Sequence, residues 1–248
     1  MSNKKKKKNS NYQTAKRAAE TNVKKKKKLS KEAIVGIVCL AVILVAVALS
    51  ITFCAINNRP AYVKITVEGH GDIILELDAK TAPITVENFL MLVNDGFYDG
   101  LTFHRIIENF MIQGGDPLAN GTGGNTDKNG KEINIKGEFS NNGVKNDISH
   151  KRGVISMARS GNQYNPSAAY NTASSQFFIC NADAPHLDGD YAAFGWVIAG
   201  MDVVDSITAE GMKYTSAEQN GAISDKSKQP VITSITEISK KEAMKYAK

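Results

Sequence analysis

The segment FHRIIENFMIQGGD, residues 103–116, carries the pattern from which the rest of the chain is interpreted. Its apolar residues form two short blocks separated by a polar Glu-Asn pair, which is typical of two strands joined by a turn. Met111 and Gln113 are two positions apart on the second strand and therefore share a face. Arg105 is the one cation of the segment. The segment therefore combines apolar and neutral polar residues around one Arg.

A second segment repeats this spacing farther along the chain. Gln176 and Phe178 are also two positions apart in an apolar run. If the two faces converge, they form an apolar pocket of Phe and Met edged by two amides and one guanidinium. The alternative is that these apolar strand residues belong to an ordinary core, which is where such residues usually lie. The residues alone leave both interpretations open.

Outward from these segments, the soluble body predicts many short strands and only two helices. The strands are expected at 62–67, 73–77, 101–107, 110–113, 153–158, 176–181, 193–198 and 231–238, and the helices at 83–94 and 201–209. Short strands separated by Gly and Asn turns favour an antiparallel sheet closed on itself. Two long loops, 117–134 and 159–175, are candidates for function.

The ordered motifs of the body resemble the cyclophilin family of peptidyl-prolyl isomerases. They comprise FHRII and FMIQGGD within 103–116, NGTGG at 120–124, GVISMA at 153–158, SQFFI at 175–179, LDG at 187–189 and FG at 194–195. The resemblance covers about residues 61–238 in the family's order. It implies a mainly-β fold, a closed eight-stranded antiparallel β-barrel capped by two helices, over residues 61–240.

The same resemblance assigns expected roles residue by residue. Arg105 matches the catalytic arginine, and Gln113 matches the glutamine that holds it. The proline pocket is implied at Phe110, Met111, Phe178 and Leu187, and the flanks of the bound peptide at Gly121, Thr122, Ala158 and Gln176. Three positions depart from many eukaryotic members: His186 replaces a Trp, Tyr191 replaces a pocket His, and Arg159 replaces an Asn. We expect all three to line the substrate site, and these departures are more similar to bacterial members.

The implied activity is rotation about X-Pro peptide bonds. Because this reaction makes and breaks no covalent bond, we expect neither a cofactor nor a metal. The expected partners are proline-containing unfolded or exported polypeptides. The alternative is a chaperone or tether that binds proline-containing segments with negligible turnover.

Charge is distributed unevenly over the 248 residues. The formal net charge is +6, but residues 1–33 hold 13 basic and 2 acidic residues, and residues 34–248 hold 18 basic and 23 acidic. The body therefore lacks the cation excess of a nucleic-acid-binding domain. Residues 1–32 contain two five-lysine runs and almost nothing apolar, which predicts a disordered tail. A nucleic-acid-binding role of this tail is a further alternative.

Residues 33–56 contain no charge and no proline over 24 positions. As a helix they would span about 35 Å, enough to cross a hydrocarbon core of about 30 Å. The lysines before this segment predict a cytoplasmic N-terminus and an extracytoplasmic body, with lysine runs near anionic lipids. The apolar run is longer than a signal peptide's, which favours an uncleaved anchor. Residues 57–60 are then a linker, and residues 241–248 a C-terminal tail.

Overall fold

The structure is a computed structural model of the chain that describes residues 30–57, 59–161, 164–215 and 217–247. For residues 33, 48–57 and 217 only the backbone is described. The chain divides into two units, Met1–Thr52 and Phe53–Lys248, which are taken separately below. Most of the predicted tail, at residues 1–29, lies outside the described residues, as does position 58 of the predicted linker.

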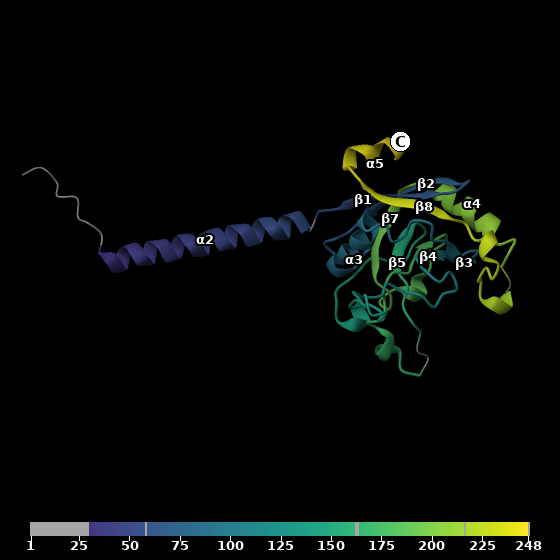
Figure 1. The fold of residues 1–248 in the computed structure, drawn as a ribbon, viewed down its shortest axis with the longest axis horizontal. Coiled ribbons are helices and arrows are strands. Elements are labelled where there is room, and N and C mark those ends of the chain that lie inside the picture. Colours follow the sequence, from purple (N-terminus) through teal and green to yellow (C-terminus); the bar gives the residue numbers. More distant parts are fainter. Residues whose placement is uncertain (1–29, 58, 162–163, 216, 248) are drawn as a thin grey trace, which may run out of the picture. The chain divides into compact units, whose positions relative to one another are not determined.

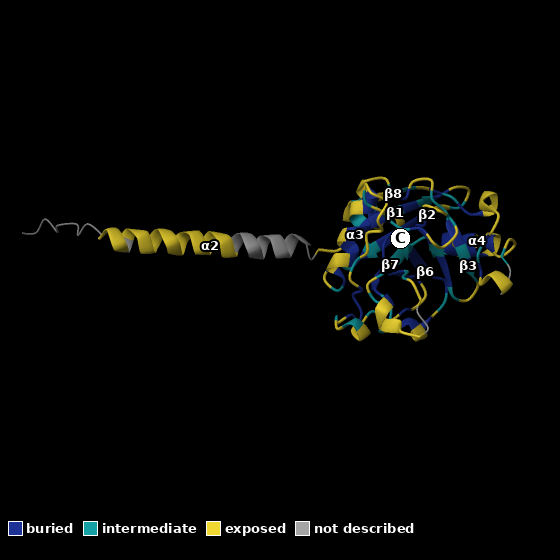
Figure 2. Ribbon diagram, turned by 60° about the horizontal axis from the view of Figure 1, so that its bottom comes forward, coloured by how far each residue is buried: buried dark blue, intermediate teal, exposed yellow. Residues whose placement is uncertain are grey.

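Helix α2 runs from Lys31 to Asn57 and includes the predicted helix at 33–56. The side chains described between residues 34 and 47 are exposed, as Figure 2 shows in yellow, and Val42 reaches 63% exposure. Within the described part of the chain, no helix has the length and apolar character of a membrane span.

The body is built on one antiparallel sheet of eight strands in the described residues, in the order β3-β4-β6-β5-β7-β2-β1-β8. The strands are β1 (Ala61–Val67), β2 (Gly71–Leu77), β3 (Phe103–Ile107), β4 (Met111–Gly114), β5 (Val154–Met157), β6 (Phe177–Cys180), β7 (Ala193–Ala199) and β8 (Ile232–Ile238). Each overlaps one predicted strand, because short apolar-rich runs bounded by turn residues mark where strands form. The predicted strand number and antiparallel pairing are confirmed.

The two ends of this sheet, β3 and β8, meet over only a few residues. Thr102 pairs with Val231 in an isolated bridge, and the Ile232 N–H donates to the Leu101 carbonyl at 2.8 Å. These contacts lie at or just beyond the strand ends, not along a full ladder. The sheet is therefore a curled half-barrel. Its eight antiparallel strands agree with the prediction, but the predicted full closure of the barrel is not confirmed.

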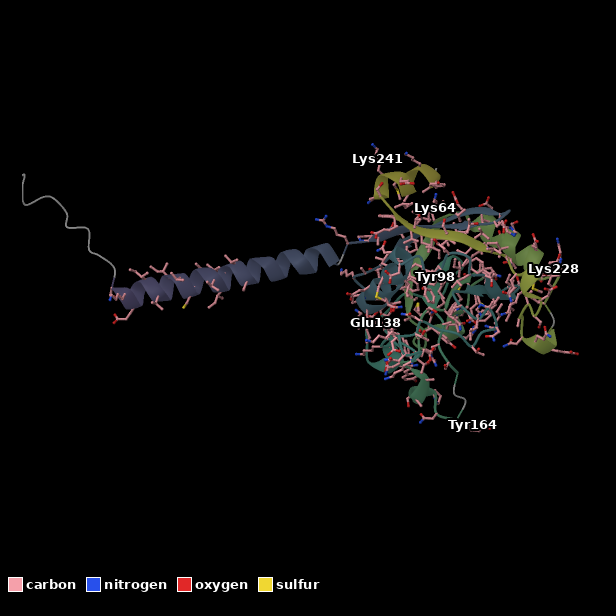
Figure 3. All side chains as sticks on the ribbon, viewed as in Figure 1. Lys64, Tyr98, Glu138, Tyr164, Lys228 and Lys241 are labelled. Carbon is pink, nitrogen blue, oxygen red and sulfur yellow. The ribbon has the colours of Figure 1, made fainter. Side chains whose placement is uncertain are left out.

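Two helices pack on the sheet at opposite sides of the body (Figure 1): α3, Pro83–Asn94, and α4, Met201–Gly211. The prediction of α3 had the same bounds, with Pro in its first turn. Phe89 on α3 is fully buried, and its ring centroid lies 5.2 Å from that of Tyr98 and 5.3 Å from that of Phe194. Tyr98, labelled in the middle of the body in Figure 3, donates its hydroxyl hydrogen to the Ser175 carbonyl at 3.0 Å. An aromatic cluster thus lies under α3, within a larger core that is mostly aliphatic.

A third helix of the body, α5 (Lys240–Tyr246), occupies most of the segment expected to be a tail. The Ser239 hydroxyl caps it by accepting from the Glu242 N–H at 3.2 Å, and Ala243 is fully buried against the sheet. The described residues of the body also contain five short 3-10 turns: η1 (Ser140–Asn142), η2 (Pro166–Ala169), η3 (Pro185–Leu187), η4 (Ala217–Gln219) and η5 (Lys226–Lys228).

Candidate active site

The sheet register lines up side chains from four adjacent strands. Arg105 on β3 is the cross-strand partner of Gln113 on β4, which pairs with Phe178 on β6, which pairs with Ser156 on β5. Directly opposite residues of an antiparallel sheet project from the same face. A guanidinium, an amide and an aromatic ring therefore lie in one row; the two-residue spacing had left open whether the Gln113 and Phe178 faces converge.

A continuous run of hydrogen bonds fixes the polar side of this row. Arg105 donates from Nη1 to Gln113 Oε1 at 3.0 Å, and Gln113 Nε2 donates to Gln176 Oε1 at 2.8 Å. Gln176 Nε2 donates in turn to the Gly123 carbonyl at 2.7 Å. Arg105 Nε donates to the Asn220 carbonyl at 2.8 Å. These bonds orient the guanidinium from two sides.

Arg105 is half-buried at the edge of this row. Burial lowers its pKa from the ordinary value, with an opposing contribution from Tyr191, but a guanidinium stays protonated at any physiological pH. Its Nη2 has no hydrogen-bond partner within the described part of the chain. The guanidinium of Arg105 is therefore held in place, and its Nη2 group can still donate a hydrogen bond to a bound ligand.

An apolar pocket lies beside Arg105. Met111, Phe178 and Leu187 are 1%, 4% and 6% exposed, and they form one buried cluster with Cys180 and Ala184. The cavity at this cluster measures about 440 Å³. Eleven of the thirteen predicted site residues line it: Arg105, Phe110, Met111, Gln113, Gly121, Ala158, Arg159, Phe178, His186, Leu187 and Tyr191.

The remaining two predicted residues, Thr122 and Gln176, line a neighbouring cavity of about 330 Å³. Both cavities share Gln113, Gly121, Ala158 and Arg159 as wall residues. The thirteen predicted residues therefore gather around two adjoining hollows, although their individual roles stay predictions.

Arg159 is held differently from Arg105. Its guanidinium carbon lies 4.6 Å from the ring centroid of Tyr191 and 5.4 Å from that of Tyr170. Its Nε donates to the Asp190 carbonyl at 2.9 Å. Cation–π contacts and this bond keep the second cation against aromatic rings. Arg159 is therefore part of the cavity wall, where it packs against Tyr191.

One buried carboxylate shapes the loop that contributes Gly121. Asp116 is fully buried and accepts from the backbone N–H groups of Leu118, Asn120 and Gly121 at 2.7, 2.9 and 2.5 Å. Burial acts to raise the pKa of Asp116, but these three donors outweigh it and hold the pKa below its ordinary value. A side chain at Gly123 would collide with the Asp116 carboxylate, so glycine is required there.

At the cavity beside Arg105, sequence reasoning missed four residues. His104, Asn120 and Ala222 line the cavity, and the Asn220 carbonyl holds Arg105. His104 and Asn120 adjoin predicted residues, so adjacency was a usable signal. Asn220 and Ala222 come from the connection between α4 and β8, and nothing in the local sequence indicates that this connection returns to β3.

The sequence of the body is similar to that of known proteins. The family model of the cyclophilin type peptidyl-prolyl cis-trans isomerases matches residues 62–237. A peptidyl-prolyl cis-trans isomerase of Helicobacter pylori is 45% identical over 139 residues, covering 55% of this chain and 74% of the relative. One of Arabidopsis thaliana is 44% identical over 136 residues, covering 54% and 75%. Bacterial and plant relatives are similarly close, so the bacterial-like character stays a prediction.

Solved structures give the same match. A Cryptosporidium parvum cyclophilin type peptidyl-prolyl cis-trans isomerase superposes with a TM-score of 0.59 at 30% identity, covering 73% of this chain and 99% of that one. The same protein, solved in the presence of the dipeptide Ala-Pro, superposes with a TM-score of 0.57. Both matches cover the β-sheet body.

Proposed function

The chain belongs to the cyclophilin-type peptidyl-prolyl cis-trans isomerases, and on that premise we propose that Arg105 accelerates X-Pro rotation from the rim of the Phe178 pocket. It is an isomerase of the rotamase type, acting on proline-containing peptides. The observation that supports this assignment of the site is the hydrogen-bond run from Arg105 through Gln113 to Gln176, bordering an apolar cavity.

The reaction needs no covalent catalyst. Partial double-bond character gives the amide a rotation barrier of about 18–20 kcal/mol, and an X-Pro bond rotates unaided in roughly 10–100 s. Twisting the amide localises a lone pair on the proline nitrogen. A guanidinium donor directed at that lone pair stabilises the twisted state more than the planar one, which lowers the barrier. The apolar pocket holds the ring while the preceding carbonyl turns.

The test is a protease-coupled isomerisation assay on a proline-containing peptide. We expect Arg105→Ala to lower kcat/KM by about 100- to 1000-fold, the loss seen when one transition-state donor is removed. Arg105→Lys is the matched control, because it retains a cation without the planar fork that Gln113 holds. We expect it to recover only part of the rate. Equal rates for wild type and Arg105→Ala at the uncatalysed level would instead favour the alternative of a binding chaperone or tether, and equal rates above that level would contradict the role of Arg105.

We further propose that residues 33–56 anchor the chain in a membrane, with the body on the extracytoplasmic side. The support is the uncharged composition of this segment and the exposed apolar side chains along α2, which water solvates poorly. The lysines before α2 favour a cytoplasmic N-terminus and contact with anionic lipids. The clients would then be exported polypeptides folding near the membrane.

Protease treatment of intact cells tests this topology. We expect the body to be cleaved from outside while an N-terminal tag stays protected. Protection of the body in intact cells, with cleavage only after lysis, would contradict the proposed orientation.

A further inference from the structure

A buried polar cluster lies behind the proline pocket and has no part in the mechanism above. His150 is 1% exposed and Ser156 is fully buried. His150 Nδ1 lies 2.8 Å from Asp188 Oδ1, and His150 Nε2 lies 3.1 Å from Ser156 Oγ. The Asp188 carboxylate also accepts from the His150 backbone N–H at 2.7 Å and from the Ser149 hydroxyl at 2.8 Å.

The partners fix the hydrogen positions in this cluster. Burial lowers the pKa of His150 below its ordinary value, although Asp188 opposes this, so the ring is neutral at pH 7. A carboxylate only accepts, so Nδ1 carries the hydrogen that Asp188 receives. Nε2 is then an acceptor, and the Ser156 hydroxyl must donate to it. Every polar group in the run from Asp188 to Ser156 is paired.

The order of these bonds resembles a hydrolytic triad, but the geometry excludes that chemistry. A nucleophilic serine must reach an acyl carbon and an oxyanion site. Ser156 is 0% exposed on the central strand β5 and lines neither cavity of the site. An acyl substrate has no route to it.

The cluster instead contacts two separate walls of the proline pocket. The His150 ring stacks on the Phe178 ring with centroids 6.1 Å apart and planes 19° apart. Ser156 is also the cross-strand partner of Phe178. On the other side, Asp188 directly follows Leu187 at the end of η3, and the His150 carbonyl accepts from the Ala184 N–H at 2.7 Å.

We propose that the His150–Asp188 pair is a positioning device that sets the distance between the Phe178 and Leu187 walls of the proline pocket. Phe178 comes from the sheet, whereas Leu187 comes from a 3-10 turn that the sheet ladder does not hold. His150 joins the two through its stacked ring, its carbonyl and its bond to Asp188. Without the ring, the turn that carries Leu187 keeps its backbone bonds to residue 150 but loses the side-chain contact that sets it against Phe178.

This inference rests on the proposed Arg105 site and predicts a separable kinetic effect. The pair touches the ring pocket and not the guanidinium, so its loss weakens peptide binding. We expect His150→Ala to raise KM about tenfold and to change kcat less than about threefold, since misplaced binding groups cost such factors. The activities of wild type and of Arg105→Ala are measured in the same assay. They test the proposed role of Arg105 independently of the His150–Asp188 pair.

His70 offers a matched control. Its side chain is 7% exposed and joins the β1–β2 turn to α4, with Nδ1 2.9 Å from Ser206 Oγ and Nε2 3.5 Å from Glu210 Oε2. It is a buried bridging histidine away from the pocket. We expect His70→Ala to lower the melting temperature as His150→Ala does, with KM unchanged. Equal KM values for His150→Ala, His70→Ala and wild type would overturn the proposal.

If His150→Ala fails to fold, two substitutions of Asp188 test the same positioning role of the His150–Asp188 pair. Asparagine retains an oxygen that accepts from both the ring and the backbone N–H of His150, whereas alanine retains none. We expect Asp188→Ala to raise KM about tenfold and Asp188→Asn to stay within about twofold of wild type. Identical KM values for Asp188→Ala and wild type would show that the pair contributes only to stability.

Discussion

Two of the three guanidinium nitrogens of Arg105 are held by hydrogen bonds to the protein. These bonds limit the direction in which the third nitrogen, Nη2, can point. Nη1 is fixed by Gln113 and Nε by the Asn220 carbonyl. Gln113 is itself oriented by Gln176. Pre-orientation of this kind raises the rate because the donor need not reorganise as the amide twists. In the proposed mechanism, this arrangement lets a single cation act on the twisted amide.

Asp116 gives a prediction that depends on pH. Its folded-state pKa is lowered below the ordinary value, so its stabilisation is fully present above about pH 4, the unfolded pKa, and is lost as pH falls through the folded pKa. We expect Asp116→Asn to reduce the free energy of unfolding at pH 7 by about 1–3 kcal/mol, the usual contribution of bonds to a charged acceptor. The difference from wild type should shrink below pH 4.

Denaturant unfolding between pH 3 and pH 7 checks this result. Asp127 is the control, because it accepts comparable backbone bonds from Asn129 and Lys131 but is only half-buried. Asp127→Asn should change stability much less than Asp116→Asn does. A pH-independent difference for Asp116→Asn would contradict the assignment of the charge as the stabilising feature.

For single residues, whether the sequence predicts a contact depends on how far apart the two residues lie in the chain. Gln113 and Phe178 were predictable because two-residue spacing fixes the face on which a strand residue lies. Asn220 was not, since its carbonyl reaches Arg105 across a sequence separation of 115 residues. The link between His150 and Asp188 spans 38 residues and was equally invisible. Local pattern predicts which residues face a site, but not which distant backbone holds them.

Among the elements, α3 depends on a residue outside itself. Its N-cap position is Ala82, which has no side-chain oxygen to accept from the first N–H groups. Glu138, labelled in Figure 3, is 2% exposed and accepts from the backbone N–H groups of Ile84 and Thr85 at 3.1 and 2.8 Å. A carboxylate at this end also complements the helix dipole. The helix is therefore capped by the segment that precedes η1.

We expect Glu138→Ala to lower the free energy of unfolding by about 2–3 kcal/mol, because it leaves buried donors unpaired. Glu138→Gln retains one acceptor and should recover roughly half of that loss. Thermal unfolding measures both, at about 2–4 °C per kcal/mol for a domain of this size. Because Glu138 lines neither cavity of the site, kcat/KM at 25 °C should stay within about twofold of wild type. A large activity loss without destabilisation would contradict this account.

The elements also show where sequence patterns stop being informative. The bounds of α3 were predictable because Pro83 and an apolar stripe mark them. Helix α5 was missed because seven residues give too few turns for periodicity, and its order depends on Ala243 packing against the sheet. The incomplete closure between β3 and β8 depends on where each strand ends, which residue patterns specify least sharply.

For the whole molecule, the net charge of +6 combines two segments of opposite sign. Residues 1–33 contribute +11 and residues 34–248 contribute −5. All thirteen predicted site residues belong to the second unit, Phe53–Lys248. Catalysis and attachment are therefore expected to be separable by cutting the chain between α2 and β1.

We predict that a fragment of residues 60–248 isomerises a short proline-containing peptide with kcat/KM within about twofold of the full chain. The reason is that the core, both cavities and the Arg105 hydrogen bonds involve only residues of this fragment. The proposed anchor gives the opposite expectation for fractionation: the full chain should sediment with membranes and resist carbonate extraction, and the fragment should not. A tenfold loss of activity in the fragment would show that α2 contributes to the site. A full chain released by carbonate would instead contradict the anchor while leaving the assignment of the active site intact.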